Sequence, residues 1–268
     1  MVLERKVLIR SGGDLASAVI QKFYRAGFKV VVSELDQPKM VRRTVSFSNA
    51  IYEGTMIVEG IKAKYVKDLG NINTCHQEDM VPVLTIKEEE IANYFKPHIF
   101  IDATLSKQPV NYHKGDYPIM IGLGPDIEAG KNVDVVIETC RGHHLGRLIF
   151  NGFAIPNTSV PGFIDGFGRE RVLRAPADGI VVCNKEIGDY VHAGDIIMTI
   201  SDQPVFSRIE GIIRGLIKPG IAVHKGLKVG DVDPRGDKSY CYSISDKGRN
   251  IAGGALEAAL MLLNGEVL

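Results

Sequence analysis

The chain has 268 residues, of which 45% are hydrophobic and 24% are charged. Its 32 basic residues balance its 32 acidic ones, so the formal net charge is zero with the histidines neutral. A neutral chain lacks the overall field that draws proteins to nucleic acid or to anionic membranes. The composition predicts a globular protein with no nucleic-acid partner and no membrane partner.

The N-terminal stretch and the cysteines predict a cytoplasmic location. Charges interrupt "MVLERKVLIRSGG", so we expect no signal peptide there, and the apolar run "ALEAALMLL" is too short to span a bilayer. The four cysteines form no C-x-x-C pair, as is typical of reduced thiols rather than of a disulfide scaffold. They are Cys75, Cys140, Cys183 and Cys241.

The segment "KVLIRSGGDLASAVIQKFYRAGFKVVVSELD" predicts a strand, a helix and a second strand. A β-branched run at 7–10 precedes a turn, an amphipathic helix extends from Leu15 to about Ala26, and a second apolar run covers 29–33. This order is typical of a doubly wound, nucleotide-binding fold.

The turn of this unit resembles the dinucleotide-binding fingerprint. Ser11, Gly13 and Ala16 take the three positions that require small residues, and Glu34 follows at the distance of a ribose-binding acid. The alternative is an ordinary strand-to-helix turn with an acid near the helix cap. The predicted binding residues are Ser11, Gly12, Gly13, Asp14 and Glu34.

Further apolar runs at 80–86, 98–104 and 117–124, with a helix at 87–96, predict a mostly parallel sheet. Ligands of such sheets bind at the carboxyl ends of the strands, where the sequence places residues 102–107. An arginine pair after the second strand either binds phosphate or forms a solvated face. The candidate ligand-binding residues from these segments are Arg42, Arg43, Lys107, Gly122 and Gly124.

Two stretches in the C-terminal half repeat each other. The pattern Gly179, Gly188, Val191, Gly194 recurs 32 residues later as Gly211, Gly220, Val223, Gly226. Strands joined by repeated glycine turns predict a barrel-sandwich, and residues 173–235 resemble the lipoyl/biotinyl-carrier fold. The hairpin "SDQPVFS" at 201–207 contains no lysine, so we expect no covalent biotin or lipoyl group.

The final stretch, "SDKGRNIAGGALEAALMLLNG", predicts a helix capped by Ser245 or Asp246 and ending near Leu263. The predicted fold class is therefore α/β, with a Rossmann-like, mostly parallel sheet in residues 1–172. A lipoyl/biotinyl-carrier-like barrel-sandwich follows in 173–235. The C-terminal helical segment, 236–268, is expected to pack back on the first domain.

The stretch "IETCRGHHLGR" at 137–147 has several interpretations. Arg141 and Arg147, with the N–H groups of the glycines between them, predict an anion-binding wall to which His143 adds a donor. Cys140 is a candidate nucleophile, because Arg141 and a protonated His143 favour a thiolate. A structural turn held by pairs of Glu138 with arginine is the alternative. Adjacent imidazoles rarely reach one ion together, so no metal site is predicted.

Several segments, taken together, resemble the selenium-dependent molybdenum hydroxylase maturation family. They are "RSGGDLASAV", "RRTVSFSNAIYEG", "IGLGPDIEAGKNVDVVIETCRGHHLGR", "VPGFIDGFGRERVLRAP" and "GLKVGDVDPRGD". The family's triple-glycine turn is here "SGG", with Ser11 in the first position. The resemblance implies an accessory protein whose partner is a molybdenum hydroxylase of the xanthine dehydrogenase type with labile selenium.

The leading hypothesis is a maturation factor that binds a small anionic ligand, either a molybdopterin-type cofactor or nucleotide, or a selenium species. It requires that the turn at 11–13 and the segment 141–147 line one hollow, and that Gly13→Val blocks binding. One alternative is an NAD(P)-dependent oxidoreductase with the barrel-sandwich as a lid. The other is a non-catalytic docking protein.

Overall fold

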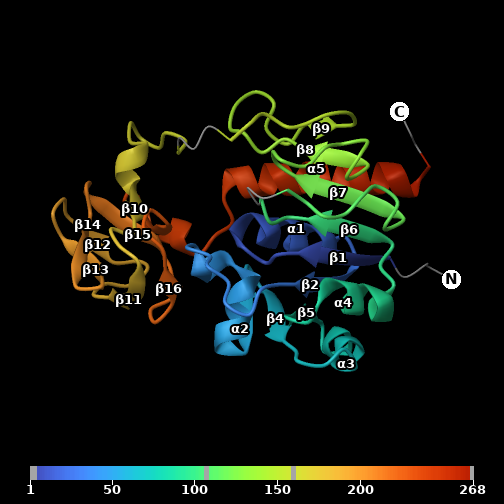
Figure 1. The fold of residues 1–268 in the computed structure, drawn as a ribbon, viewed down its shortest axis with the longest axis horizontal. Coiled ribbons are helices and arrows are strands. Elements are labelled where there is room, and N and C mark those ends of the chain that lie inside the picture. Colours follow the sequence, from blue (N-terminus) through green and yellow to red (C-terminus); the bar gives the residue numbers. More distant parts are fainter. Residues whose placement is uncertain (1–4, 106–108, 158–160, 266–268) are drawn as a thin grey trace. The chain divides into compact units, whose positions relative to one another are not determined.

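The structure, a computed structural model, describes residues 5–105, 109–157 and 161–265. The chain divides into two compact units (Figure 1). Unit 1 comprises Met1–Asp36, Phe47–Asn157 and Ile244–Leu268, and unit 2 comprises Gln37–Ser46 and Thr158–Ser243. Among the described residues, no helix combines the length and the apolar character needed to cross a membrane.

Unit 1 is built on a nine-stranded mixed sheet. Its central strands are parallel, and β3 and β9 run antiparallel to their neighbours at the two edges. The middle of β1 consists of Val7, Leu8 and Ile9, which are fully buried, because helices cover both faces of a parallel sheet. In spatial order the strands are β3 (Thr55–Val58), β4 (Ile61–Tyr65), β5 (Met80–Leu84), β2 (Lys29–Ser33), β1 (Lys6–Arg10), β6 (Ile99–Asp102), β7 (Ile119–Leu123), β8 (Val135–Ile137) and β9 (Leu148–Ile149).

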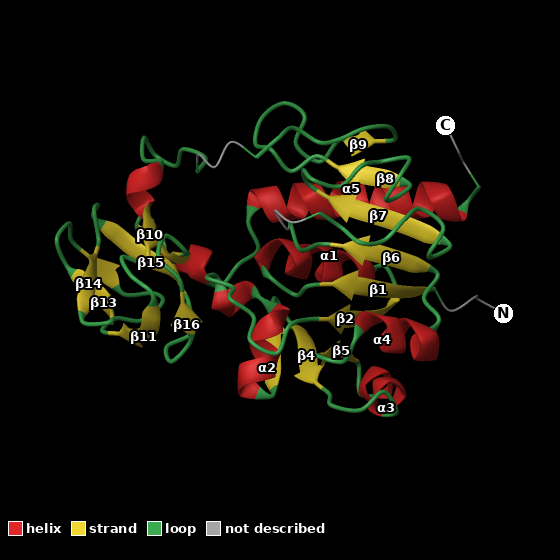
Figure 2. Ribbon diagram, in the orientation of Figure 1, coloured by secondary structure: helices red, strands yellow, loops and turns green. Residues whose placement is uncertain are grey.

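The long helices of unit 1 cover the sheet from opposite sides (Figure 2). Helices α1 (Asp14–Arg25) and α5 (Asp246–Leu263) pack against each other on one face, while α3 (Asn71–Gln77) and α4 (Glu88–Phe95) lie on the other. A short helix, α2 (Ala50–Glu53), precedes β3. The hydroxyl of Ser245 caps α5 by accepting the N–H of Gly248 at 3.1 Å.

Unit 2 contains two four-stranded antiparallel sheets. The repeated glycines have equivalent backbone conformations, since both members of each pair have positive φ, for example 99° at Gly188 and 82° at Gly220. The first sheet has the order β10 (Val172–Arg174), β17 (Lys228–Asp233), β15 (Gly211–Leu216), β12 (Tyr190–Val191). The second has the order β14 (Gln203–Phe206), β13 (Ile196–Ile200), β11 (Gly179–Cys183), β16 (Ala222–Val223).

The predicted fold class is wrong. The large sheet is mixed, and unit 2 consists of two antiparallel sheets that do not form a lipoyl/biotinyl-carrier-like barrel-sandwich. Glycine spacing specifies where the chain can turn with positive φ, but it does not specify which strands pair or how many sheets result. Unit 2 also takes residues 37–46 from the N-terminal part of the chain, a detail that spacing along the sequence cannot reveal.

Candidate functional site

The strongest candidate site of unit 1 lies at the carboxyl ends of its parallel strands. The strands β1, β2, β5 and β6 point the same way, so their last residues meet at one edge of the sheet. A cavity of about 660 Å³ opens there. Its charged lining residues are Arg10, Lys87, Glu34, Asp36, Glu88 and Asp102.

The turn after β1 is closed by the carboxylate of Glu34. This carboxylate accepts the N–H of Gly12 at 2.9 Å and the hydroxyl of Ser48 at 2.5 Å, with a longer contact of 3.4 Å from the hydroxyl of Ser11. The N–H of Ser11 donates to the carbonyl of Ser33 at 2.8 Å, which ties the turn to β2. Glu34 therefore takes the N–H that a dinucleotide fingerprint offers to a phosphate.

The glycine that the turn requires is Gly12. A Cβ on Gly12 would lie 2.9 Å from the backbone nitrogen of Ser48, whereas a Cβ on Gly13 would meet only the hydroxyl of Ser11, at 3.6 Å. Gly13 has φ −61°, and the left-handed conformation belongs to Ser11, with φ 81°. The sequence pattern had placed the close backbone approach at Gly13, whereas the structure places it at Gly12. A Cβ at Gly13 is therefore not expected to crowd the turn.

The N-terminus of α1 lies directly beyond this turn. The N–H groups of its first turn have no carbonyl partner within the helix, which makes them suitable donors for an anion. The N-cap residue is Gly13, so no side chain at the cap position accepts a hydrogen bond from them. Asp14 is the acidic residue of the first turn. An anionic group can therefore approach α1 while Glu34 stays on the N–H of Gly12.

A partly buried ion cluster supports the other wall of the cavity. The guanidinium of Arg10 donates to Glu88 at 2.5 and 3.2 Å and to Asp102 at 3.4 Å. Asp102 is 1% exposed, and it also accepts the hydroxyls of Thr104 at 2.7 Å and Tyr112 at 2.9 Å. Every carboxylate oxygen of Asp102 is thus used, so this residue holds the strand ends rather than a ligand.

The cluster shifts the acidity of its members. Burial and then the negative charge of Asp102 raise the pKa of Tyr112, and burial and then Glu88 raise the pKa of Tyr117 to about 12. Burial lowers the pKa of Arg10, but the ion pairs with Glu88 and Asp102 outweigh it and raise the net value. Both tyrosines therefore stay protonated and act as hydrogen-bond donors at neutral pH.

The cavity lining is acidic overall. Its described residues carry four carboxylates and two cationic groups, and Arg10 forms ion pairs with two of the carboxylates. Such a lining favours ligand groups that donate hydrogen bonds, for example sugar hydroxyls or ring N–H groups. The carboxylates disfavour a small anion in the cavity itself. The lining therefore differs from the anion-binding lining that was expected from the sequence.

The other residues proposed from the sheet have structural contacts. In unit 2, Arg42 donates to the carbonyls of Tyr240 and Ser243 at 2.7 and 3.0 Å, and Arg43 donates to the carbonyl of Leu216 at 2.8 Å. In unit 1, glycines 122 and 124 are small because Ile127 and Thr139 lie within 3 Å of where their Cβ atoms would stand. Lys107 lies outside the described residues.

The segment 137–147 is a loop held by Glu138. This residue is 2% exposed, and its carboxylate accepts the N–H groups of Cys140 at 2.6 Å and Ile155 at 2.8 Å. Its backbone N–H and carbonyl bond to Arg147 and Gly146, each at 2.9 Å. The alternative of a structural turn thus matches the geometry best, although Glu138 bonds to backbone groups and not to arginine side chains.

The cationic side chains of this loop do not converge on one point. Arg141 forms a two-pronged ion pair with Asp246 at the start of α5, with both N–O distances at 2.7 Å. His143 and His144 are exposed and contact each other edge to face, and Arg147 is exposed. The anion-binding wall predicted from Arg141 and Arg147 is therefore not assembled, because Asp246 occupies the guanidinium of Arg141.

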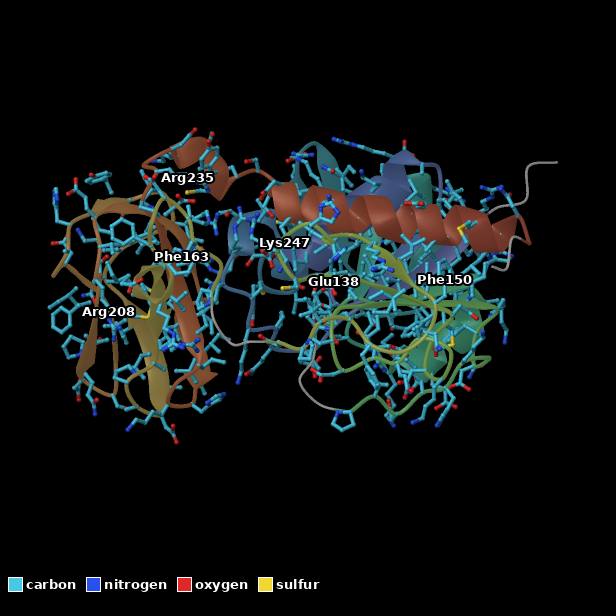
Figure 3. All side chains as sticks on the ribbon, turned by 90° about the horizontal axis from the view of Figure 1, so that it is seen from above. Glu138, Phe150, Phe163, Arg208, Arg235 and Lys247 are labelled. Carbon is cyan, nitrogen blue, oxygen red and sulfur yellow. The ribbon has the colours of Figure 1, made fainter. Side chains whose placement is uncertain are left out.

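Lys247 lies close to the 137–147 loop and was not identified from the sequence. It is half-buried at the start of α5 and interacts electrostatically with Asp14, Glu138, Cys140 and Arg141 (Figure 3 labels Lys247 and Glu138). It thus connects the end of the Ser-Gly-Gly turn with the 137–147 loop, although no residue of that loop lines the 660 Å³ cavity. In the sequence, a lysine that follows a Ser-Asp cap is typical of an ordinary surface position, so the local pattern does not identify Lys247 as a candidate site residue.

Burial, and then the positive charge of Arg141, lower the pKa of Lys247. After reductive ¹³C-methylation, the NMR signal of Lys247 is expected to titrate below the ordinary lysine value of 10.5. Arg141→Met should raise the midpoint of Lys247. A midpoint for Lys247 at or above the ordinary value in the unsubstituted chain would contradict this environment.

Comparison with known proteins gives one clear relative. No family model matches the chain. The uncharacterized protein YqeB of Escherichia coli (strain K12) is 42% identical over 258 residues, which cover 96% of this chain. The chain spans 48% of the length of that relative.

Solved structures show only a distant likeness. An aspartoacylase family protein from Mesorhizobium loti matches with a TM-score of 0.27 and 10% identity, over 85% of each chain. The ectoine utilization protein EutE (DoeB) from Ruegeria pomeroyi, with product bound, matches with a TM-score of 0.26 and 12% identity, also over 85% of each chain. TM-scores of this size support no shared chemistry. The chain is similar over nearly its whole length to about half of YqeB, a protein that is itself uncharacterized.

Proposed function

We propose that the chain is an accessory protein of selenium-dependent molybdenum hydroxylases that binds a nucleotide or a molybdopterin-type ligand in unit 1. The observation that supports a ligand is the 660 Å³ cavity at the carboxyl ends of the strands, with Glu34 at the turn and the N-terminus of α1 directly after it. The resemblance of the sequence segments supports the partner. A volume of this size suits a small-molecule ligand.

The chemistry of the lining selects the kind of ligand. Oε1 of Glu34 accepts the N–H of Leu35 at 2.8 Å and can accept a second hydrogen bond, from a ribose diol or from the amino and imino edge of a purine or pterin. A phosphate on the same ligand is stabilised by the positive end of the helix dipole at the start of α1. A ligand with a donor-rich body and an anionic end therefore matches both parts, whereas inorganic phosphate matches only one.

Glu34→Gln is expected to weaken the binding of guanosine monophosphate by about tenfold, since a hydrogen bond to a charged group contributes about 1.5–3 kcal/mol. Isothermal titration calorimetry with the full chain measures this change, and inorganic phosphate should bind more weakly than the nucleotide. Glu89→Gln, an exposed change in the same unit, is the control and should bind as the unmodified chain does. Equal affinity of both variants would remove Glu34 from the site.

The accessory role is tested in the source organism. Disruption of the gene that encodes the chain is expected to lower the activity and the selenium content of the molybdenum hydroxylase, at an unchanged level of hydroxylase protein. Glu89→Gln should restore both on re-expression, and Glu34→Gln should not. A hydroxylase with full activity and full selenium content in the disrupted strain would refute the accessory role.

A further inference from the structure

Unit 2 has a cavity of its own, and the charge of its lining differs from that of the acidic cavity of unit 1. Its volume is about 510 Å³, and its lining comes mainly from β10 and β14. These are edge strands of the two antiparallel sheets, so the cavity lies where one sheet edge faces the other. None of its lining residues is among the binding residues predicted from the sequence.

The charge of the lining is uniformly positive. The described lining residues include Arg169, Arg174 and Arg208 and no carboxylate (Figure 3 labels Arg208). All three arginines are exposed, and within the described part of the chain none of them forms a salt bridge. Arg174 donates one N–H to the carbonyl of Gly226 at 2.9 Å, which leaves its other donors available.

Glu170, which follows Arg169 in the chain, forms no salt bridge with this cluster in the described part of the chain. The carboxylate of Glu170 accepts the N–H of Gly168 at 3.0 Å and turns toward its own backbone. These backbone hydrogen bonds, and then the more distant charges of Arg208 and Arg169, lower the pKa of Glu170. Three guanidiniums thus remain around one cavity in a chain whose overall charge is zero.

The rest of the lining is apolar and includes an aromatic ring. Phe206 is 47% exposed, and Val172 and Leu173 lie on the opposite strand. Pro204 lies within β14 and Pro176 follows β10, so each edge lacks an N–H at that position. Missing donors on both edges disfavour an added peptide strand, which would be held by main-chain hydrogen bonds.

We propose that this cavity binds a small organic molecule with at least two negative charges, carried by phosphate or carboxylate groups, and with a flat or apolar body. Guanidinium forks hold phosphate and carboxylate oxygens in two-pronged hydrogen bonds. The ring of Phe206 and the proline rings provide a surface for the body of the ligand. This site is independent of the one proposed in unit 1.

The test is calorimetric titration of the full chain with two probes, ADP and citrate, which carry the same oxyanion chemistry on different bodies. Arg169→Ala/Arg208→Ala is expected to weaken whichever probe binds by more than about tenfold. Lys225→Ala removes one positive charge from an exposed position of the same unit outside the cavity, and it should change the affinity less than about twofold. With Glu34→Gln present to weaken the unit 1 site, tighter binding of ADP identifies a phosphate ester as the ligand, and tighter binding of citrate identifies a polycarboxylate.

Two further variants complete the design. Phe206→Ala should weaken ADP and leave citrate unchanged, because only ADP has a ring to stack. Glu34→Gln separates this cavity from the unit 1 site, and binding here should persist in it. The proposal is overturned if neither probe binds or if the double arginine variant binds both probes normally.

Discussion

Replacement of Asp231 by alanine is expected to destabilise unit 2 by about 3–5 kcal/mol, the usual cost of removing one partner from a buried ion pair. Asp231 is fully buried on β17 and accepts from Arg171 at 2.7 Å and from Arg214 at 2.7 Å. Without the carboxylate, the largely buried guanidinium of Arg171 keeps its charge and loses its ion pair with Asp231. Urea unfolding followed by circular dichroism, with hydrogen exchange of β15 and β17, measures the loss.

The matched control is Glu186→Ala, an exposed change in the same unit that should alter the free energy of unfolding by less than about 0.5 kcal/mol. If Asp231→Ala and Glu186→Ala have the same small effect, the buried pairs do not stabilise unit 2. Loss of exchange protection confined to unit 1 would also contradict the assignment.

The same carboxylate makes unit 2 sensitive to acid. Burial alone raises the pKa of Asp231, but Lys228, Arg214 and Arg171 outweigh it and hold the net pKa below the ordinary value of 3.8. The stabilisation is therefore complete above about pH 5 and is lost as the pH falls through the lowered pKa of the folded state. In Asp231→Asn, the free energy of unfolding should depend less on pH in this acidic range.

Replacement of Asp102 by alanine is expected to destabilise unit 1 by about 3 kcal/mol or more. The change removes the acceptor of the Tyr112 hydroxyl, of both Thr104 donors and of one N–H of Arg10. Since Asp102 is 1% exposed, water cannot replace these bonds without opening the strand ends. Hydrogen exchange of β1 and β6 should rise together, and nucleotide binding in the adjacent cavity should weaken.

Glu257→Ala, on the exposed side of α5, is the control for Asp102→Ala and should leave both exchange and binding unchanged. Asp102→Asn keeps one acceptor oxygen and should lose less stability than the alanine variant. An alanine variant as stable as the control would mean that Arg10 and Glu88 suffice to hold the cavity wall.

Local patterns predicted the elements around the first turn accurately. The runs at 7–10 and 29–33 correspond to β1, Lys6–Arg10, and β2, Lys29–Ser33, and the predicted helix corresponds to α1, Asp14–Arg25. The Ser245 cap and the end of the last helix at Leu263 also agree with α5. These features depend on hydrophobic period and capping, which act between residues a few positions apart.

The details of the site depend on partners that are remote along the chain. Glu34 bonds to Gly12 across 22 positions, and Arg141 pairs with Asp246 across 105. The second pairing removed Arg141 from the predicted anion-binding wall. No local pattern identifies such partners, because every polar side chain has many possible ones until the fold selects among them.

The sequence by itself determined the strand–turn–helix unit, the caps of α5 and the repeated glycine turns of unit 2, since each follows from residues in local contact. Only the tertiary structure decided that Gly12, not Gly13, is the crowded glycine, and that Lys247 lies between the turn and the 137–147 loop. It also decided that Arg169, Arg174 and Arg208 surround one cavity. The reason is physical: strand pairing and helix packing bring distant residues together, and their combined charge and exposure define a site that none of them shows alone.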